Sequence, residues 1–109
     1  MDITTETNTI NSNWTDNDGN HQGGQSCGIG FTIAWQRGGL NTTDRNGAFI
    51  IDVLDVCLNQ LNYFQNSKFA TTENAEAINN LQKTIDVLIA RRDRRKAEGT
   101  LGTHELDKH

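Results

Sequence analysis

The chain has 109 residues, of which 34% are hydrophobic, and it carries a formal net charge of −4. This length accommodates one small domain, and so low an apolar content gives a thin core that favours oligomerisation. The acidic balance argues against a general nucleic-acid coat protein, because such a domain would normally be basic.

The cellular context is indicated by the cysteines and by missing targeting signals. Cys27 and Cys57 are isolated, without metal-ligand spacing or a disulfide-rich pattern, which suits a reducing cytosol. The sequence shows no basic segment followed by an apolar run, so we expect no signal peptide. No apolar stretch approaches the length needed to span a membrane. We therefore expect a cytoplasmic protein.

The first 26 residues are rich in Asn, Thr, Asp and Gly. Such a segment buries too little apolar surface to offset the entropy of ordering it. We expect residues 1–26 to form a polar, largely flexible arm, in which Trp14 is the residue able to anchor the arm on a surface. Residues 27–109 are then expected to form a single domain.

A strand is expected in residues 28–40. Ile29, Phe31, Ile33 and Trp35 alternate with small or polar residues, which is typical of a strand with one apolar face. Gly38 and Gly39 then interrupt the pattern. Because no second strand of this quality follows, its partner must be an N-terminal segment or another subunit, and we favour a small sheet that uses both.

Residues 48–98 are expected to form a helical hairpin. Apolar residues recur every three or four positions from Ala48 to about Gln65, which is typical of an amphipathic helix. Thr71 or Thr72 can cap a second helix. Its apolar positions have 3-4-3 spacing, suited to antiparallel packing on the first helix: Ile78, Leu81, Ile85 and Leu88. Gly99 is expected to end it, before a polar tail at 99–109.

The expected fold class is therefore α+β. A small N-terminal antiparallel β element precedes a C-terminal antiparallel α-helical hairpin, and the protein is oligomeric.

Five of the ten positive charges lie at the end of the second expected helix, between Arg91 and Lys96. Cations at a helix C-terminus complement its dipole, which explains one or two of them. Arg91 and Arg95, however, fall one turn apart on one face, where like charges repel. A bound phosphate or pyrophosphate would relieve that repulsion, and the guanidinium fork suits phosphate recognition.

A second candidate site is the loop from Tyr63 to Phe69 together with Asn74. Its aromatic residues could belong to the hairpin core. An exposed Phe64 ring beside an amide and Lys68 would instead suit stacking on a base and reading its edge. Within one hairpin, this loop lies at the opposite end from Arg91 and Arg95. Only a second subunit, or a fold that brings the strand region across, could unite the two regions. If both bind one ligand, we expect a pocket shared at a subunit interface.

The third candidate lies in the tail, where Thr103 and His104 could donate to a phosphate or belong to a frayed end. Signals for catalysis are poor. None of the histidines (His21, His104 and His109) has the spacing of a metal site or a nucleophilic triad. We expect no enzyme, no metal and no cofactor.

The helical half also resembles a known family. The resemblance rests on four segments: Asn46 to Phe49, Leu61 to Ala70, Glu73 to Ile78 and Arg91 to His104. They resemble the helical-hairpin domain shared by Thoeris anti-defence sponges and the cyclic-oligonucleotide sponges of phages that oppose CBASS. The strand ending at Trp35 resembles the N-terminal β portion of the Thoeris group.

The resemblance implies that the protein sequesters a signal without chemistry. Family members bind cyclic ADP-ribose isomers made by TIR-domain sensors, or cyclic di- or trinucleotides at separate sites, and assemble as dimers or hexamers. The family's signal pocket matches Phe64, Asn74, Arg91 and Arg95, and a second nucleotide site matches Lys68, Thr103 and His104. Arg92, Arg94 and Lys96 depart from the family pattern, which is usually acidic or neutral there.

Two functions follow from the sequence. The first is a nucleotide-signal sponge acting in the cytoplasm of the infected host cell. The second is a nucleic-acid or protein interaction module that grips a phosphate backbone with its basic helix end. A polymer binder should spread its basic residues along a face, whereas here they are bunched at one end of an acidic chain.

Overall fold

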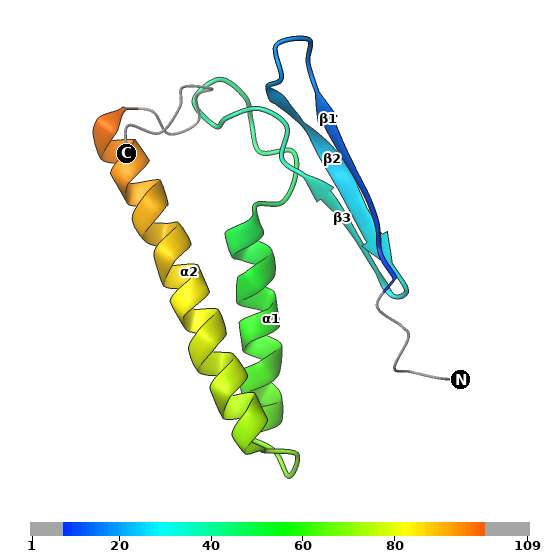
Figure 1. Ribbon diagram of the computed structural model, residues 1–109, viewed down its shortest axis with the longest axis vertical. Helices are drawn as coiled ribbons and strands as arrows, with labels where there is room; N and C mark the ends of the chain where they lie inside the picture. Colours follow the sequence, from blue (N-terminus) through cyan, green and yellow to red (C-terminus); the bar gives the residue numbers. More distant parts are fainter. Residues whose placement is uncertain (1–7, 100–109) are drawn as a thin grey trace. The chain divides into compact units, whose positions relative to one another are not determined.

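The computed structural model describes residues 8–99, which form two compact units joined between Ala48 and Phe49 (Figure 1). The N-terminal unit holds three strands, β1 (Ile10–Thr15), β2 (His21–Gly28) and β3 (Phe31–Trp35). The helical unit holds α1 (Ile50–Gln65) and α2 (Thr72–Glu98). The expected α+β class, with an antiparallel β element followed by two helices, is confirmed. The boundary expected at residue 27 does not coincide with this division.

The strands form an antiparallel sheet in the order β1-β2-β3. Two tight turns connect them, and each turn contains a glycine with positive φ, Gly19 at +82° and Gly30 at +89°. In the first turn, the Asp16 carboxylate accepts the backbone N–H groups of Asp18 and Asn20, both at 2.9 Å. Hydrogen bonds of polar side chains therefore stabilise this turn, in a segment that has little apolar surface to bury.

The expectation of a largely flexible arm was wrong for residues 10–26, because they form β1 and most of β2. The N-terminal segment is indeed a partner of the expected strand, which begins at Phe31 rather than residue 28. Ile29 lies in the turn before it and is exposed. Trp14 lies at an irregularity in the β1–β2 register and is also exposed.

The register places Phe31, Ile33 and Trp35 on one face of β3. Glycine makes this arrangement possible, because a Cβ atom built on Gly28 would meet the Phe31 ring at 2.6 Å. The Trp35 indole N–H donates to the Ser26 hydroxyl at 2.8 Å. The aromatic rings therefore lie over small neighbours on β2.

Gln36 is buried directly after β3, with 6% of its surface exposed. Its Oε1 accepts the backbone N–H groups of Asn46 and Gly47, both at 2.9 Å. Its Nε2 donates to the carbonyl oxygens of Gly38 and Asp44, both at 3.2 Å. One side chain thereby closes the loop from residue 37 to residue 47.

The same loop is closed by two further contacts. The Asn46 side chain pairs with both backbone groups of Arg37, at 2.8 and 2.9 Å. Gly47 passes so close to β3 that an added Cβ would lie 2.7 Å from the Ala34 carbonyl oxygen. Ala48 then bridges to Trp35, so the chain leaves the N-terminal unit at a fixed point.

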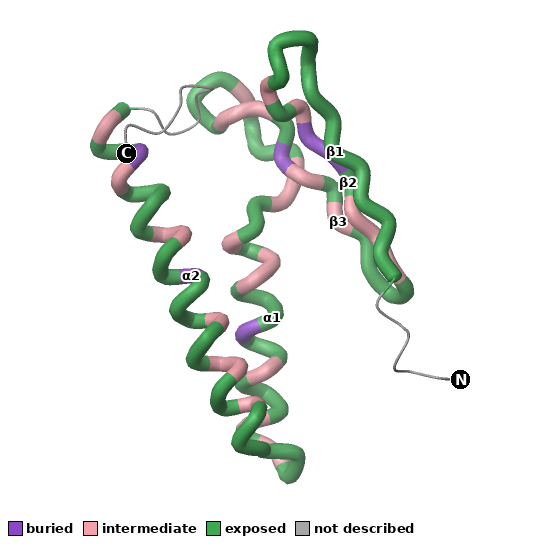
Figure 2. The backbone as a smooth tube through the Cα atoms, viewed as in Figure 1, coloured by how far each residue is buried: buried purple, intermediate pink, exposed green. Residues whose placement is uncertain are grey.

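In the helical unit, α1 and α2 pack against each other as an antiparallel hairpin, as expected (Figure 1). Buried hydrophobic side chains in the described chain are Leu58 on α1, 9% exposed, and Ile85 on α2, 4% exposed (Figure 2). The expected seam on α2 is confirmed, since Ile78, Leu81 and Leu88 are partly buried on the same face as Ile85. So small a core leaves much apolar surface of the two helices exposed.

Both ends of α2 are capped by the residues expected from the sequence. The Thr71 hydroxyl accepts the backbone N–H of Asn74 at 2.9 Å. Gly99 adopts the left-handed conformation, with φ of +75°, and its N–H reaches the carbonyl oxygens of Arg95 and Lys96. By contrast, Phe49, which precedes α1, provides no side-chain cap, and the N–H groups of Asp52 and Val53 donate to its carbonyl oxygen instead.

Replacing Thr71 with alanine is expected to lower the free energy of unfolding of the helical unit by about 1 kcal/mol, because the N-cap hydrogen bond is lost. Thermal unfolding followed by helical circular dichroism measures the change. Thr72→Ala removes the same hydroxyl from the next residue, which does not cap the helix, and should leave the midpoint nearly unchanged. An equal loss in both variants would contradict the capping role.

Candidate functional site

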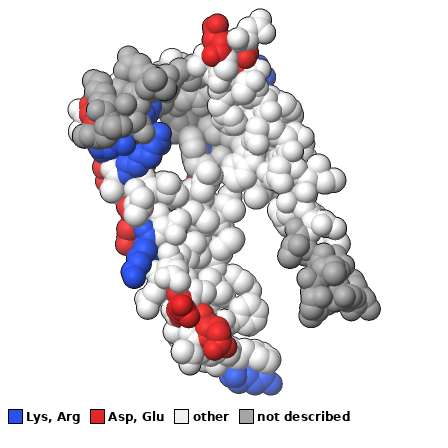
Figure 3. Space-filling view, viewed as in Figure 1, with Lys and Arg blue, Asp and Glu red and all other residues white. Residues whose placement is uncertain are grey.

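The basic cluster, defined as Arg91, Arg92, Arg94, Arg95 and Lys96, occupies the last turns of α2 (Figure 3). Two of its members form ion pairs within the helix. Arg92 contacts Asp93 and Arg94 contacts Glu98, both at 3.4 Å. The Arg94–Glu98 pair is largely shielded from solvent, with 29% and 18% of its side chains exposed. These two arginines are therefore at least partly neutralised by local carboxylates.

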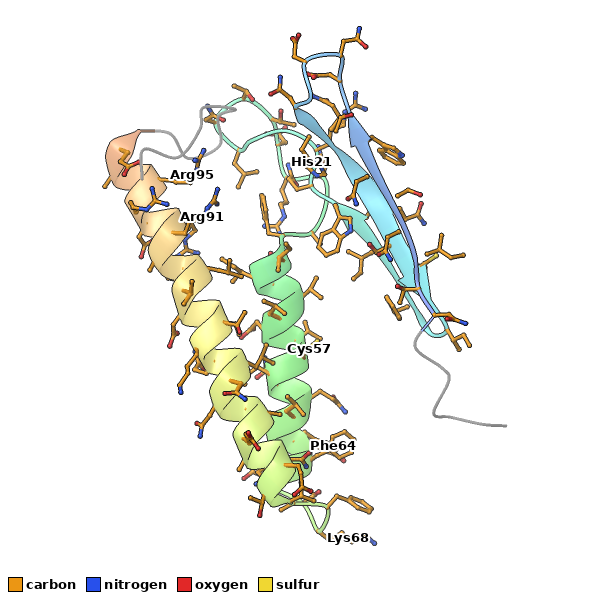
Figure 4. The ribbon with its side chains drawn as sticks, in the orientation of Figure 1. His21, Cys57, Phe64, Lys68, Arg91 and Arg95 are labelled. Carbon is orange, nitrogen blue, oxygen red and sulfur yellow. The ribbon has the colours of Figure 1, made fainter. Side chains whose placement is uncertain are left out.

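Arg91 and Arg95 lie one turn apart on one face of α2, as the sequence predicts (Figure 4). Arg91 is exposed, whereas Arg95 is buried, with 6% of its surface accessible. In the described chain, no buried side-chain nitrogen or oxygen lacks a hydrogen-bond partner. Both arginines also interact within the protein, and Arg91 is the more accessible of the two.

The basic cluster extends beyond the end of α1. α2 has 27 residues and α1 has 16, so their lengths are about 40 and 24 Å. Because a short loop joins them, about the last ten residues of α2 project past the first residue of α1. The N-terminus of α1 lies at the base of this projection, and Asp52 in its first turn complements the helix dipole there. The positive charge at this end of the helical unit comes from the basic cluster.

The other end of the hairpin carries the aromatic cluster, defined as Tyr63, Phe64 and Phe69. The Tyr63 and Phe64 rings pack edge to face, with centroids 5.5 Å apart. The Lys68 ammonium lies 5.4 Å from the centroid of Phe69. All three rings are exposed, so the expectation that they could be hairpin core is not borne out. Exposed rings beside a cation can stack on a nucleobase.

The loop between the helices is held in shape by side chains whose role the sequence analysis missed. The Gln65 amide exchanges two hydrogen bonds with the backbone of Thr71, at 2.9 and 3.1 Å. The Ser67 hydroxyl donates to the Phe64 carbonyl oxygen at 2.6 Å and accepts the Phe69 N–H at 3.1 Å. The sequence does contain a signal for this loop. Gln65 and Ser67 flank the end of the first helix, and amide and hydroxyl side chains at such positions often close turns.

Asn74 has a structural contact as well as a predicted ligand role. Its side-chain amide donates to the Phe69 carbonyl oxygen at 3.3 Å. This bond occupies part of the amide, and the remaining donor and acceptor capacity is available to a second partner. Asn74 thus lies with Phe64 and Lys68 at the loop end of the hairpin.

The predicted site residues fall into two groups at opposite ends of the helical unit (Figure 4). Phe64 and Lys68 lie at the loop end with Asn74, whereas Arg91 and Arg95 lie at the far end of α2. Asn74 and Arg91 are separated by about 25 Å along the helix axis. The prediction that one hairpin cannot unite them is confirmed. Thr103 and His104, of the second predicted nucleotide site, lie outside the described residues.

Residues 8–99 contain neither a metal-binding cluster nor a membrane-spanning helix. No three His, Cys, Asp or Glu side chains in this range gather closely enough to hold a metal ion. Neither α1 nor α2 is long and apolar enough to cross a lipid bilayer. Within this range, the grouped side chains that suit a ligand are those of the basic and aromatic clusters.

No protein-family model matches this chain. It is similar to a curated protein named Thoeris anti-defense 1, from Bacillus phage SBSphiJ7. The two are 36% identical over 74 residues, which cover 68% of this chain and 52% of that relative. The chain thus spans about half the length of the relative it matches. The chain belongs to the Thoeris anti-defence family.

Proposed function

We propose that this protein is a phage anti-defence protein that binds and holds a cyclic nucleotide immune signal without cleaving it. The favoured ligand is a cyclic ADP-ribose isomer made by a TIR-domain sensor, and cyclic di- or trinucleotides are the further candidates. The site of action is the cytoplasm of the infected host cell. The anti-defence role rests on the family and on the phage origin of the relative.

The observation that carries this proposal is the paired arrangement of Arg91 and Arg95. Two guanidinium groups on one face suit a compact diphosphate better than an extended polymer. The aromatic cluster supplies the stacking surface that a nucleobase requires. Because the two clusters lie at opposite ends of one hairpin, the proposed ligand bridges two protomers.

The arginine pair and the aromatic cluster can supply the free energy that tight binding of a nucleotide requires. Binding tighter than micromolar needs about 8 kcal/mol or more. Hydrogen bonds to charged groups contribute about 1.5–3 kcal/mol each, and a stacked base about 1–3 kcal/mol. Burial of apolar ligand and protein surface in a pocket between protomers supplies the rest.

The alternative is a module that binds nucleic acid or a protein through the basic cluster. Its supporting observation is that Arg91, Arg92 and Lys96 are exposed. Against it, the ion pairs of Arg92 and Arg94 reduce the positive charge available to a phosphate backbone.

A thermal-shift panel separates the two functions. A cyclic ADP-ribose isomer or a cyclic oligonucleotide should raise the melting temperature, and duplex DNA should not; a shift with DNA alone would support the alternative.

Replacing Arg91 with alanine is expected to weaken binding of the cyclic ligand roughly 10- to 100-fold, because one charge-assisted contact is lost. Calorimetric titration measures the dissociation constant. Arg92→Ala is the matched control, since it removes the same charge from the neighbouring residue, which is paired with Asp93. Equal weakening in both variants would mean that net charge, rather than a shaped site, determines binding. Arg91 suits this test better than Arg95, whose removal would also empty a buried position.

The absence of cleavage is tested on the complex itself. Heating the complex should release the ligand with its original mass, because holding the signal requires no chemistry. Recovery of a linearised product by mass spectrometry would instead identify an enzyme.

A further inference from the structure

The sheet of the N-terminal unit has two edges, and the chain covers them to different extents (Figure 1). Along β3, the Ala48 N–H donates to the Ala34 carbonyl oxygen at 2.8 Å, and the Ala48 carbonyl oxygen accepts the Gln36 N–H at 3.0 Å. This parallel bridge covers one end of the β3 edge. Along β1, no backbone hydrogen bond within residues 8–99 reaches the outer edge, and all six residues of the strand are exposed.

The outer edge of β1 lacks the features that usually keep an edge strand from pairing. Its sequence, Ile10–Thr15, contains no charged residue and no proline. The irregularity in the β1–β2 register leaves β1 itself regular, because Trp14 lies opposite the two residues Gln22 and Gly23 of β2. Gly23 has φ of +85°, which suits the extra residue of such a bulge. A regular, uncharged edge of this kind is a template for another strand.

The contact between β1 and β2 indicates which backbone groups of β1 face outward. The Ser12 carbonyl oxygen lies against Gly24 of β2, where an added Cβ atom would overlap it. Backbone groups of successive residues in a strand point to alternate edges. The N–H and carbonyl groups of Asn11 and Asn13 therefore point away from β2, toward the outer edge of the sheet.

The side chains of β1 are self-complementary about Ser12. Because side chains alternate along a strand, Ile10, Ser12 and Trp14 lie on one face of the sheet. Ile10 is 72% exposed and Trp14 is 53% exposed. When two β1 strands pair antiparallel with Ser12 opposite its own copy, each Ile10 lies opposite the partner's Trp14. Aliphatic and aromatic side chains placed directly opposite each other stabilise a sheet, and no like charges meet.

We propose that the outer edge of β1 pairs with β1 of a second copy, antiparallel and centred on Ser12, so that the strands of both copies form one continuous sheet. The two-fold axis passes through Ser12 perpendicular to the sheet, so the interface is closed and admits one partner. A second copy fits this edge better than a strand of another protein, because one register matches the apolar side chains of both chains. No residue of β1 belongs to the basic or the aromatic cluster, so this interface goes beyond the function proposed above.

On the other face of the sheet, the same register places each Asn11 opposite the partner's Asn13. An asparagine amide can both donate and accept hydrogen bonds, so these side chains can bond to each other across the interface. Both faces of the paired strands are therefore compatible with the register centred on Ser12.

The first test measures molecular mass by light scattering. Ser12→Lys places two lysines opposite each other at the centre of the interface, where they repel. Gln25→Lys is the matched control, since Gln25 pairs with Ser12, is also exposed and lies one strand further from the proposed axis. The native protein should be at least a dimer, Ser12→Lys should at least halve its mass, and Gln25→Lys should leave the mass unchanged. A monomeric native protein, or a Ser12→Lys variant of native mass, would overturn the proposal.

The second test detects the pairing without breaking it. In a protein with Cys27→Ser and Cys57→Ser, Ser12→Cys places two thiols on Cα atoms about 4.5–5.5 Å apart across the proposed axis, within the range of a disulfide. Gln25→Cys is the control, because three strand spacings, about 14 Å, would separate its two copies. Mild oxidation should join two chains through position 12 but not through position 25, as measured by non-reducing gel electrophoresis.

Two results of the crosslinking test would overturn the proposal. Equal crosslinking at positions 12 and 25 would mean that the chains meet by random collision. Crosslinking through Asn13→Cys but not through Ser12→Cys would exclude the register that pairs Ile10 with Trp14. Both tests are made without a ligand, so a failure to bind any cyclic nucleotide would contradict the proposed function and leave the β1 interface unaffected.

Discussion

Replacement of Gln36 by leucine is expected to lower the free energy of unfolding of the N-terminal unit by about 2–6 kcal/mol. The Gln36 Oε1 accepts two backbone N–H groups in a buried position, and leucine accepts none. Each buried group left without a partner costs about 1–3 kcal/mol. The carbonyl oxygens of Gly38 and Asp44 lose their donor as well.

Tryptophan fluorescence reports this loss directly, because Trp14 and Trp35 both lie in the N-terminal unit. The midpoint of denaturant unfolding should fall sharply for Gln36→Leu. Gln25→Leu is the matched control, since Gln25 is exposed in the same unit and its replacement should change stability by less than about 0.5 kcal/mol. Similar midpoints for the two variants would show that the Gln36 hydrogen bonds do not stabilise the loop.

Gln36 also marks the limit of what the sequence can predict for this unit. Alternation of apolar residues identified β3, because that signal is local and has a period of two. The closure of the loop by Gln36 depends on groups ten and eleven residues away, which no periodic pattern encodes. Likewise, β1 and β2 lack an apolar alternation, and their pairing depends on turn hydrogen bonds such as those of Asp16. For this reason, a prediction based on composition alone treated residues 10–26 as a flexible arm.

The helical unit was predicted more completely, because its determinants are local. Thr71 and Gly99 have the side-chain chemistry and backbone freedom that helix ends require, and both occupy the expected positions. The opposite placement of Phe64 and Arg91 also follows from the hairpin alone. The burial of Arg95 could not be predicted, because helical spacing gives the direction of a side chain but not the atoms that surround it.

The two halves of the candidate site thus differ in how they are prepared for a ligand. At the loop end, Gln65 and Ser67 fix the backbone that presents the aromatic cluster. At the other end, the burial of Arg95 and the Arg94–Glu98 pair fix part of the basic cluster. Each half is therefore partly ordered within one chain. Preorganisation of this kind lowers the entropy that is lost when a ligand binds.

Ile85→Ala is expected to lower the free energy of unfolding of the helical unit by about 2–5 kcal/mol, because it removes a buried side chain and leaves a cavity. Ile85 is 4% exposed and lies on the face of α2 that packs against α1.

Val87→Ala is the matched control, since Val87 lies two residues along the same helix and is 68% exposed. Its replacement should change stability by less than about 0.5 kcal/mol. Helical circular dichroism measures both variants, because the helices lie in this unit, while tryptophan fluorescence monitors the N-terminal unit. A fall in the helical midpoint with an unchanged fluorescence midpoint would mean that the two units unfold separately. Equal midpoints for Ile85→Ala and Val87→Ala would contradict the assignment of Ile85 to the core of the hairpin.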